Sequence, residues 1–469
     1  MAIRKYGQVD DETFRSRATT VDEKGKRKWI FATKPFGDFY KWRNYLAYFL
    51  VAFFLVLPWI YYKGNQLVQF NLIEGRFIIF GKIFWPNDFF IFAVMFITAV
   101  IVVVLFTVVY GRIFCGWICP QTIFMEFVFR KIEWWIEGNP AQQKKLAAAP
   151  WNREKILKKG AKQLIFFAIS FFFANTFLAY IIGSRELVEK IQSPISENWS
   201  ILSGLLIFTL MFYIVFAYVR EIVCTTICPY GRLQGVMYDK DTMQISYDYK
   251  RGEPRGKLKD KDAFGLGDCI DCNRCVVVCP TGIDIRNGAQ MECVGCTACI
   301  DACDDIMDKI NLPRGLIRYA SENEIQTGKK SPLSTRAKAY TVVLVLLIFV
   351  LMGLLISRDN IDMYVGRVKG QTFLVENGMV SNLLDAQIIN KSNRDIPIQI
   401  RLIDKKGNIN VIGNSSGMIL KKENSNKITF FVALPENQLK SRTTKIKIGI
   451  YEGEKLLKKV SVNFLGPFK

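Results

Sequence analysis

The chain has 469 residues, 50% of them hydrophobic, with a formal net charge of +21, 12 cysteines and no histidine. Without histidine there can be no His-ligated haem, no His-containing zinc or di-iron centre and no imidazole base. Metal chemistry must therefore use thiolate, carboxylate or methionine ligands. The length exceeds one ordinary domain, and a soluble protein this basic would suggest a nucleic-acid partner.

Five apolar segments are each long enough to cross the core of a bilayer, which takes about 20 residues or somewhat fewer. They cover residues 45–61, 89–110, 164–183, 201–219 and 340–357. Because 44 mostly polar residues precede the first segment, we interpret it as a retained anchor and not as a cleavable signal peptide. The sequence therefore predicts an integral membrane protein.

Basic residues alternate along the connections between these spans. Lys and Arg number 11 in 1–44, 3 in 63–87, 10 in 111–162, 2 in 183–200 and 18 in 219–338. By the positive-inside rule, the N-terminus and the two basic connections are cytoplasmic, and an odd number of spans places the C-terminus on the outer side of the membrane. The net charge is then mainly a topology signal, so we expect no nucleic-acid partner. All 12 cysteines lie on the predicted cytoplasmic side, where thiols stay reduced.

The second and fourth spans end in matching elements, "IFCGWICP" and "IVCTTICP". The paired thiols are Cys115 with Cys119, and Cys224 with Cys228. Residues i and i+4 of a helix share a face, so each pair should point one way, and packed hairpins would bring four thiols together. Thiolates are soft ligands that select Cu(I), zinc or iron–sulfur clusters. The duplication favours a metal or redox role, although buried cysteine also occurs as a small hydrophobic residue.

Two further apolar segments are not expected to cross the membrane. The segment 121–138, "QTIFMEFVFRKIEWWIEG", has apolar side chains near helical spacing and charges on the other face. It predicts a helix that lies in the cytoplasmic interface or packs under the spans. The aromatic segment 70–88 is short and interrupted by Gly, and predicts a hairpin at the outer surface.

The connection between the fourth and fifth spans contains two cysteine runs, "CIDCNRCVVVCP" and "CVGCTACIDAC", both spaced C-x2-C-x2-C-x3-C. In two-cluster ferredoxins, three thiolates of each run bind one [4Fe–4S] cluster and the fourth binds the other. The predicted ligands are Cys269, Cys272, Cys275 and Cys303 for one cluster, and Cys279, Cys293, Cys296 and Cys299 for the other. Asp304 follows the second run where Pro280 follows the first, which alters the turn but removes no ligand.

Zinc is the alternative metal for these eight thiols. Zinc ribbons use paired C-x2-C knuckles, whereas each run here has three closely spaced cysteines followed by a fourth, and this pattern favours iron–sulfur clusters. Cluster pairs move single electrons. Since the chain has no flavin or haem motif, we expect the electrons to end on a metal ion, a quinone or a partner protein.

The tail from residue 359 to 469 has no helical period. Segments such as "LLDAQIINKS", "IPIQIRLID", "KITFFVAL" and "TKIKIGIYEG" alternate or are β-branched, which predicts an antiparallel β-sandwich. The tail lacks cysteine, histidine and any catalytic constellation, so docking or assembly is its expected role.

The sequence therefore predicts a multi-domain membrane protein with five spanning helices. Its expected parts are a cytoplasmic N-terminal segment (1–44), a four-span domain (45–230), a cytoplasmic ferredoxin-like domain (231–338), a fifth transmembrane helix (339–358) and a periplasmic Ig-like β-sandwich (359–469).

The motifs "GRIFCGWICPQT", "CPYGRLQ", "CPTGIDIRNG", "QMECVGCTACIDACD" and "PRGLIRY", with the terminal sandwich, resemble the CcoG/FixG/RdxA family of cytochrome c oxidase accessory proteins. The resemblance covers nearly the full chain. It implies reduction of Cu(II) to Cu(I) for the copper centre of a cbb3-type oxidase, with copper at Cys115, Cys119, Cys224 and Cys228, and clusters on the eight other cysteines. The implied partners are oxidase assembly factors or a copper transporter or chaperone.

Two other functions remain open on the residues alone. One is a quinol-oxidising polyferredoxin subunit, and the other is a redox sensor or assembly scaffold acting through the exterior sandwich. The sequence does not identify the electron donor, and it is compatible with a homo-oligomer.

Overall fold

The computed structural model describes residues 20–467 except 22–23, 25, 63, 72–74, 86–87, 195, 197, 330–333, 369, 371, 377, 393, 414–417, 423 and 440. Half of the predicted N-terminal segment, 1–44, therefore falls outside the described residues. The chain forms two compact units, which are described separately. The first comprises Met1–Ile60, Gln66–Leu72 and Phe90–Leu351, and the second comprises Tyr61–Asn65, Ile73–Phe89 and Met352–Lys469.

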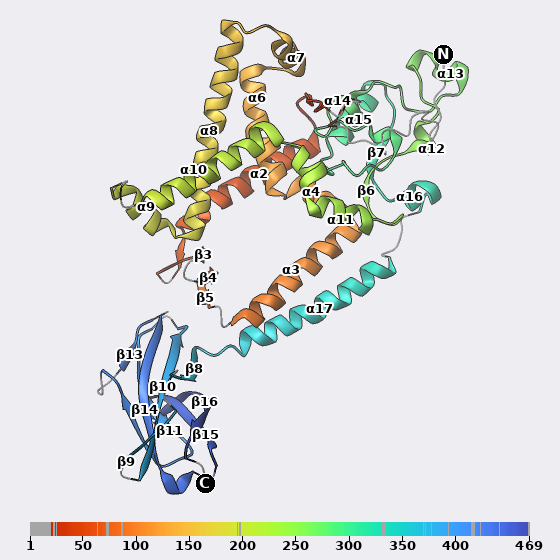
Figure 1. The fold of residues 1–469 in the computed structure, drawn as a ribbon. Coiled ribbons are helices and arrows are strands. Elements are labelled where there is room, and N and C mark those ends of the chain that lie inside the picture. The colour runs from red at the N-terminus through yellow and green to blue at the C-terminus, as the bar shows by residue number, and fades with distance from the viewer. Residues whose placement is uncertain are drawn as a thin grey trace. The chain divides into compact units, whose positions relative to one another are not determined.

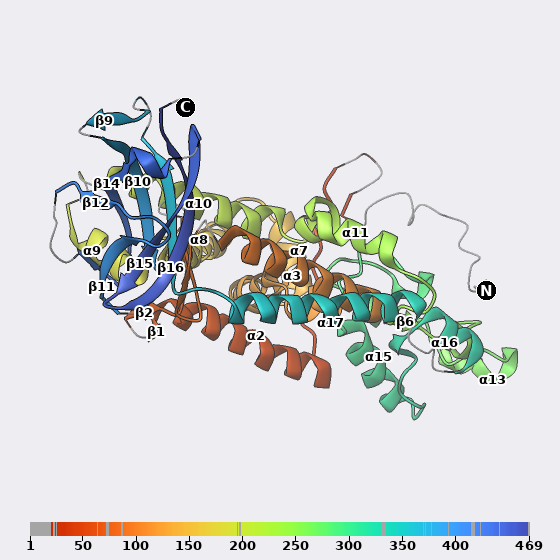
Figure 2. The same cartoon turned by 90° about the horizontal axis from the view of Figure 1, so that it is seen from below.

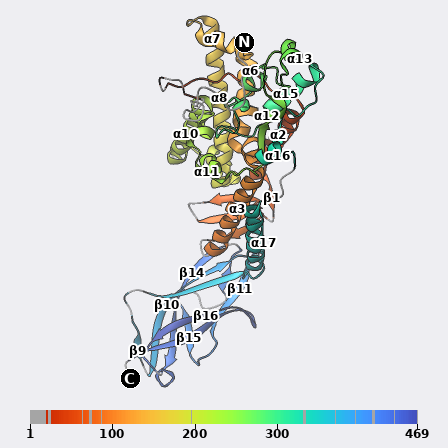
Figure 3. The ribbon, with the colours of Figure 1, turned by 90° about the vertical axis from the view of Figure 1, so that its right-hand side faces the viewer.

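Five helices of the described chain are long and apolar enough to cross a membrane, which confirms the five predicted spans (Figure 1). They are α2 (Asp38–Val56) with the 3-10 turn η1 (Leu57–Trp59), α3 (Phe89–Tyr110), α8 (Arg153–Ile181), α10 (Trp199–Ile214) with the π-turn η5 (Val215–Val219), and α17 (Thr335–Ile356). Helix α3 and helix α17 run side by side in Figures 1, 2 and 3.

Helices α2 and α8 begin well before the apolar segments that they contain. Helix α2 begins at Asp38, and its first N–H groups are capped from another element, because the carboxylate of Asp301 accepts from Phe39 N and Tyr40 N at 3.1 and 2.8 Å. Helix α8 begins at Arg153 with Asn152 as its side-chain cap. A hydropathy pattern misses such polar first turns, because capping and not burial determines where a helix starts.

The segment predicted as one amphipathic helix is helical throughout, from α5 (Pro120–Ile123) through the π-turn η3 (Phe124–Phe129) to α6 (Arg130–Glu137). Phe124 and Phe127 are buried, which agrees with a helix packed against the spans. Several charged side chains on its other face are buried as well. Glu133 is 4% exposed and pairs with Arg220 and Lys162. Burial by itself would raise the pKa of Glu133, but these cations hold it at about 2.

The remaining connections of the first unit are short. They are α4 (Ile113–Trp117), α7 (Pro140–Ala148), α9 (Ser184–Gln192), the π-turn η6 (Val223–Ile227), α11 (Pro229–Met237) and strand β3 (Val68–Asn71). The two-residue strands β1 (Tyr61–Tyr62) and β2 (Asn65–Gln66) come between η1 and β3 in the sequence, and β1 belongs to the second unit.

The cysteine-rich part of the first unit is mostly loop around a small core. Its elements are β6 (Gln244–Tyr247), α12 (Tyr249–Gly252), η7 (Leu258–Asp260), α13 (Lys261–Phe264), α14 (Arg274–Val277), η8 (Ile285–Asn287), α15 (Ala298–Lys309), β7 (Ile317–Ala320) and α16 (Glu322–Thr327). Strands β6 and β7 pair antiparallel, and buried Ile245, Ile300 and Leu316 contribute to one apolar cluster with Cys269 and Cys275.

The second unit contains the sandwich. One sheet has the order β12-β14-β10-β8 with β9 on β10, and the other has the order β13-β11-β15-β16. The strands are β8 (Ile361–Arg367), β9 (Leu374–Glu376), β10 (Met379–Asn390), β11 (Ile396–Leu402), β12 (Asn408–Val411), β13 (Met418–Leu420), β14 (Ser425–Pro435), β15 (Thr443–Glu452) and β16 (Lys455–Leu465), with the 3-10 turn η9 (Glu436–Gln438) between β14 and β15. Alternate residues such as Leu384, Phe430 and Ile448 are fully buried between the sheets. This confirms the predicted β-sandwich.

The predicted hairpin before α3 is also present, as strands β4 (Arg76–Ile79) and β5 (Lys82–Phe84). The two residues between them, Phe80 and Gly81, have φ of 50° and 72°. Positive φ at both central residues is the pattern of the tight turns that match the twist of two antiparallel strands.

Candidate functional site

The two Cys-x-x-x-Cys-Pro elements have the same local structure. In each, the first cysteine lies in a short helical turn (Cys115 in α4, Cys224 in η6) and the second is the N-cap of the helix that follows. Cys119 N donates to Phe114 O at 3.0 Å, and Cys228 N donates to Val223 O at 2.7 Å. Both bonds span five residues, as in a π-turn. The sequence repeat is therefore a structural repeat.

The expectation that each cysteine pair lies on one continuous helix is wrong. The backbone of Cys119 has ψ of 124° and that of Cys228 has ψ of 114°, so the chain is extended at both residues. The cause is the proline that follows, which disfavours helical geometry in the residue before it and suits the first position of a new helix. Each pair therefore lies across a break between two helices.

The four thiols are nonetheless neighbours. Cys224 interacts electrostatically with Cys115, Cys119 and Cys228, and Cys119 interacts with Cys228. Burial raises the pKa of the Cys115 thiol to about 11 and that of Cys224 to about 12, and it also raises the pKa of Cys119. A metal cation would have to supply the charge that makes thiolates of these groups near neutral pH.

The first predicted cluster set surrounds one pocket. Cys269, Cys272, Cys275 and Cys303 all line it, together with Tyr247 and Arg286. Cys272 is exposed to solvent, whereas Cys269 and Cys275 are buried. Four thiols from both runs thus meet here, three from the first and one from α15.

The second predicted set lines a separate pocket, which also touches Cys275 of the first set. Its thiols are Cys279, Cys293, Cys296 and Cys299. Cys296 of this set and Val294, which lines the same pocket, belong to an apolar cluster against which Cys115 and Cys224 pack. The second set is therefore the one that meets the membrane-edge pairs.

Concave pockets lined by four thiols fit the donor set of a [4Fe–4S] cluster. Within the part of the chain that the structure describes, no three cysteine, aspartate or glutamate side chains are close enough to hold one metal ion. Four ligands of one zinc ion crowd around it at about 2.3 Å. The sulfur ligands of a cubane bind different iron atoms and lie farther apart, so the eight thiols fit clusters better than zinc.

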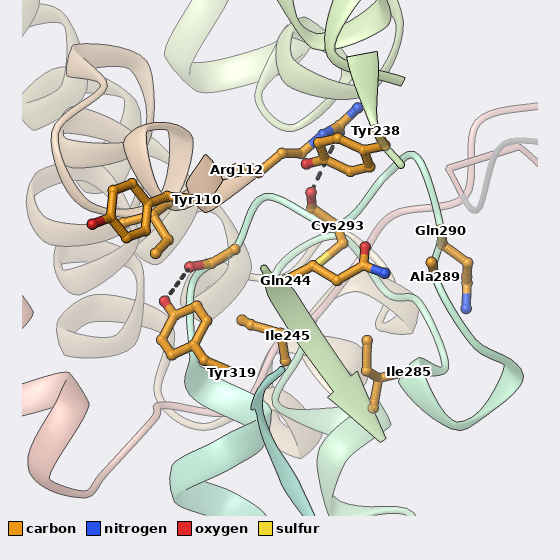
Figure 4. A pocket seen from close by; sticks show the side chains of 12 residues that line it. Tyr110, Arg112, Tyr238, Gln244, Ile245, Ile285, Ala289, Gln290, Cys293 and Tyr319 are labelled. Carbon is orange, nitrogen blue, oxygen red and sulfur yellow. Dashed lines mark hydrogen bonds between the residues drawn. The ribbon is translucent and has the colours of Figure 1, made fainter. Parts of the chain in front are cut away.

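Sequence reasoning missed the polar residues that connect these thiols. Gln234 is fully buried, and its side-chain oxygen accepts from Cys115 Sγ at 3.5 Å. Arg112, between α3 and α4, donates to the carbonyl of Cys293 at 3.3 Å, and Tyr238 lies beside it (Figure 4). Arg112, Tyr238 and Tyr319 line a further pocket, which is drawn in Figure 4. There the hydroxyl of Tyr319 donates to Gly295 O at 3.5 Å. Arginine directly after an apolar span was the available signal, because buried charge at membrane depth is costly and marks function.

Three family models match this chain. A 4Fe-4S dicluster domain matches residues 219–322, a 4Fe-4S binding domain matches residues 92–139, and the Ig-like fold at the C-terminus of FixG matches residues 351–467. The fold, the thiol-lined pockets and these matches define a multi-pass membrane protein that carries iron–sulfur clusters and transfers electrons.

Curated relatives specify the family. The chain is 31% identical over 404 residues to protein RdxA of Cereibacter sphaeroides, covering 83% of this chain and 85% of RdxA. It is 31% identical to RdxB of the same organism, covering 80% of this chain and 82% of RdxB. With the nitrogen fixation protein FixG of Rhizobium meliloti it shares 35% identity, over 67% of this chain but only 61% of the length of FixG. The chain belongs to the FixG/RdxA family.

Proposed function

We propose that this protein takes up single electrons on two [4Fe–4S] clusters and uses them to reduce Cu(II) to Cu(I) at the membrane-edge thiols, for assembly of the copper centre of a cbb3-type oxidase. The observation that carries the proposal is the packing of Cys115 and Cys224, one from each element, against the buried residues of the second cysteine run. Both pairs thereby adjoin the same electron-transfer centre.

The proposed cluster ligands are the two sets of four cysteines that line the two pockets. When bound, the clusters supply single electrons. One electron converts one Cu(II) ion to one Cu(I) ion, which soft thiolates bind in preference to Cu(II). In the described residues these thiols are adjacent but are not gathered around one point, so binding one copper ion would require their side chains to rotate toward it.

The test is an anaerobic reduction assay on the detergent-purified protein. The protein is reduced with dithionite, and the excess reductant is removed. Cu(II) is then added, and the Cu(I) that forms is measured with a Cu(I)-selective chelator. Two one-electron clusters should yield about two Cu(I) per chain. Cys115→Ser/Cys119→Ser should yield little, while its iron content stays that of wild type. An undiminished yield from that variant would contradict the proposal.

We further propose that the cysteine-bearing ends of the spans face the cytoplasm and the sandwich faces the periplasm of a bacterial inner membrane. The alternation of basic residues supports this orientation. A reporter active only outside the cytoplasm should work when fused after Lys469 and be silent when fused near Arg251. The reverse pattern would contradict both the orientation and a cytoplasmic electron source. We propose oxidase assembly factors or a copper transporter or chaperone as partners of the assembled protein.

One observation favours a second candidate function. The family model described as a 4Fe-4S binding domain matches residues 92–139, which contain only Cys115 and Cys119 among the cysteines. In this candidate the membrane-edge pairs hold iron, and the protein is an all-iron electron-transfer subunit, with quinol as one class of donor. Metal analysis separates the two, because two clusters require about eight iron atoms and three require about twelve.

A further inference from the structure

Two buried arginines lie where the membrane-edge pairs meet the second cysteine set. Arg43 of α2 is 3% exposed, and Arg112, just after α3, is 5% exposed. Arg130 and Arg220 are similarly buried, and both pair with glutamates. In the described residues, no carboxylate pairs with Arg43 or Arg112. Since buried charges are normally paired, these two positive charges need another negative partner.

Arg43 connects the first element to the second cysteine run. Its Nε and one terminal nitrogen donate to Gly116 O at 3.1 and 2.9 Å, between the two cysteines of the element. Its other terminal nitrogen donates to the carbonyl of Cys296 at 2.7 Å. One planar guanidinium thus holds two backbones together, which a lysine ammonium cannot do with the same fixed geometry.

Arg112 makes the corresponding connection to the second element. One of its terminal nitrogens donates to the carbonyl of Gly231, in the helix that follows Cys228. The other donates to the carbonyls of Met291 and Cys293, the latter at 3.3 Å (Figure 4). Each arginine therefore joins one Cys-x-x-x-Cys-Pro element to one cysteine of the second set.

Between the arginines, the two backbones are in direct contact. A Cβ added to Gly116 would lie 2.5 Å from Gly295 O, and one added to Gly295 would lie 2.6 Å from Arg112 O. Such distances are too short for any other residue to fit without a shift of the backbone. The seam is therefore built for close approach between the first element and the loop "CVGC" of the second set.

We propose that Arg43 and Arg112 are paired positioning residues that hold the second cysteine set against both membrane-edge elements and raise the reduction potential of the centre bound there. A thiolate-ligated cluster is the missing negative partner for the two charges. Its reduced form carries one more negative charge than its oxidised form, so a nearby buried cation favours reduction. Burial also removes the screening that would weaken such an effect at the surface.

The test is an EPR-monitored redox titration of the full chain in detergent. In Arg43→Met and in Arg112→Met, the ratio of reduced to oxidised second centre at a fixed ambient potential should fall about tenfold, which is 59 mV for one electron. The first centre should keep its potential. Repeating the titration in a Cys272→Ser background, in which the first centre is lost, isolates the signal of the second.

Arg232→Met is the matched control, because it removes an exposed positive charge one residue beyond Gly231. It should leave both potentials unchanged. An unchanged potential of the second centre in both buried-arginine variants, with iron content intact, would overturn the proposal.

If the methionine variants lose the second centre, the proposal is tested with Arg43→Lys and Arg112→Lys instead. Each keeps the charge but not the bridge, so the potential should stay near that of wild type while Cu(I) formation slows. Equal rates of Cu(I) formation in the lysine variants and in wild type would contradict the positioning role. This last arm rests on the proposed copper function, whereas the potential shift is measured without copper, so failure of one is distinguishable from failure of the other.

Discussion

The two cysteine sets differ in what surrounds them. The first set presents Cys272 to solvent, next to exposed Arg274 and Val277. The second is packed against Cys115 and Cys224, with buried arginines at its edge. One centre is therefore accessible to an external donor, and the other adjoins the proposed copper site. From this comparison we propose a direction of electron transfer, with electrons arriving at the exposed set and leaving from the buried one.

The largest expected effect is loss of copper binding at the buried end. Cys224→Ser/Cys228→Ser should abolish stoichiometric Cu(I) binding, because two thiols from one element leave the site half built. Competition with a Cu(I) chelator measures the affinity, and the iron content serves as the control. Full Cu(I) binding in this variant and in the matching variant of the first pair would show that the repeat is structural.

Removing one ligand from either set should distinguish the functions of the two sets. In Cys272→Ser and in Cys299→Ser, iron should fall from about eight to about four atoms per chain, because each set holds one cluster. Only Cys299→Ser should also weaken Cu(I) binding, since the second set packs against the membrane-edge thiols. Iron analysis and chelator competition check this, and equal copper affinity in the two variants would contradict the assigned direction.

Copper binding should depend on pH more strongly than reduction of the exposed centre. The raised pKa values of Cys115 and Cys224, about 11 and 12, mean that these thiols are protonated at neutral pH. Each thiolate ligand formed then releases one proton, so the Cu(I) affinity should rise up to about tenfold per pH unit for each proton. Titration between pH 6 and pH 8 against a pH-corrected chelator measures the slope, and a pH-independent affinity would exclude buried thiol ligands.

The smallest effect should come from charge at the exposed end. Arg274→Glu places a negative charge two residues from Cys272. It should slow reduction of the first centre by the dithionite anion by a factor of roughly 1.4 to 5, as expected for a surface charge interaction of about 0.2–1 kcal/mol. The effect should vanish at high salt. Stopped-flow absorbance records it, and the same substitution at exposed Arg401, in strand β11 of the sandwich, is the control. An identical response of both variants would argue against reduction through the exposed face.

Much of this architecture could be predicted from residue order alone. Apolar length determined the five spans, period-two alternation determined the sandwich, and cysteine spacing determined the number of thiol sets, because each of these signals is local in the chain. The pairing of Cys303 with the first run and Cys279 with the second also follows from spacing.

Tertiary structure alone decided how the thiols are connected. Nothing in the local pattern shows that Asp301 caps α2, that Glu133 is buried among cations, or that Arg43 bridges Gly116 and Cys296. These contacts join residues far apart in sequence. They form only in the folded chain, where buried N–H groups, carbonyls and charges are removed from water and must find partners. The broken helices at Cys119 and Cys228 were signalled by the following prolines, but the meeting of both pairs at one cysteine loop required the packed unit.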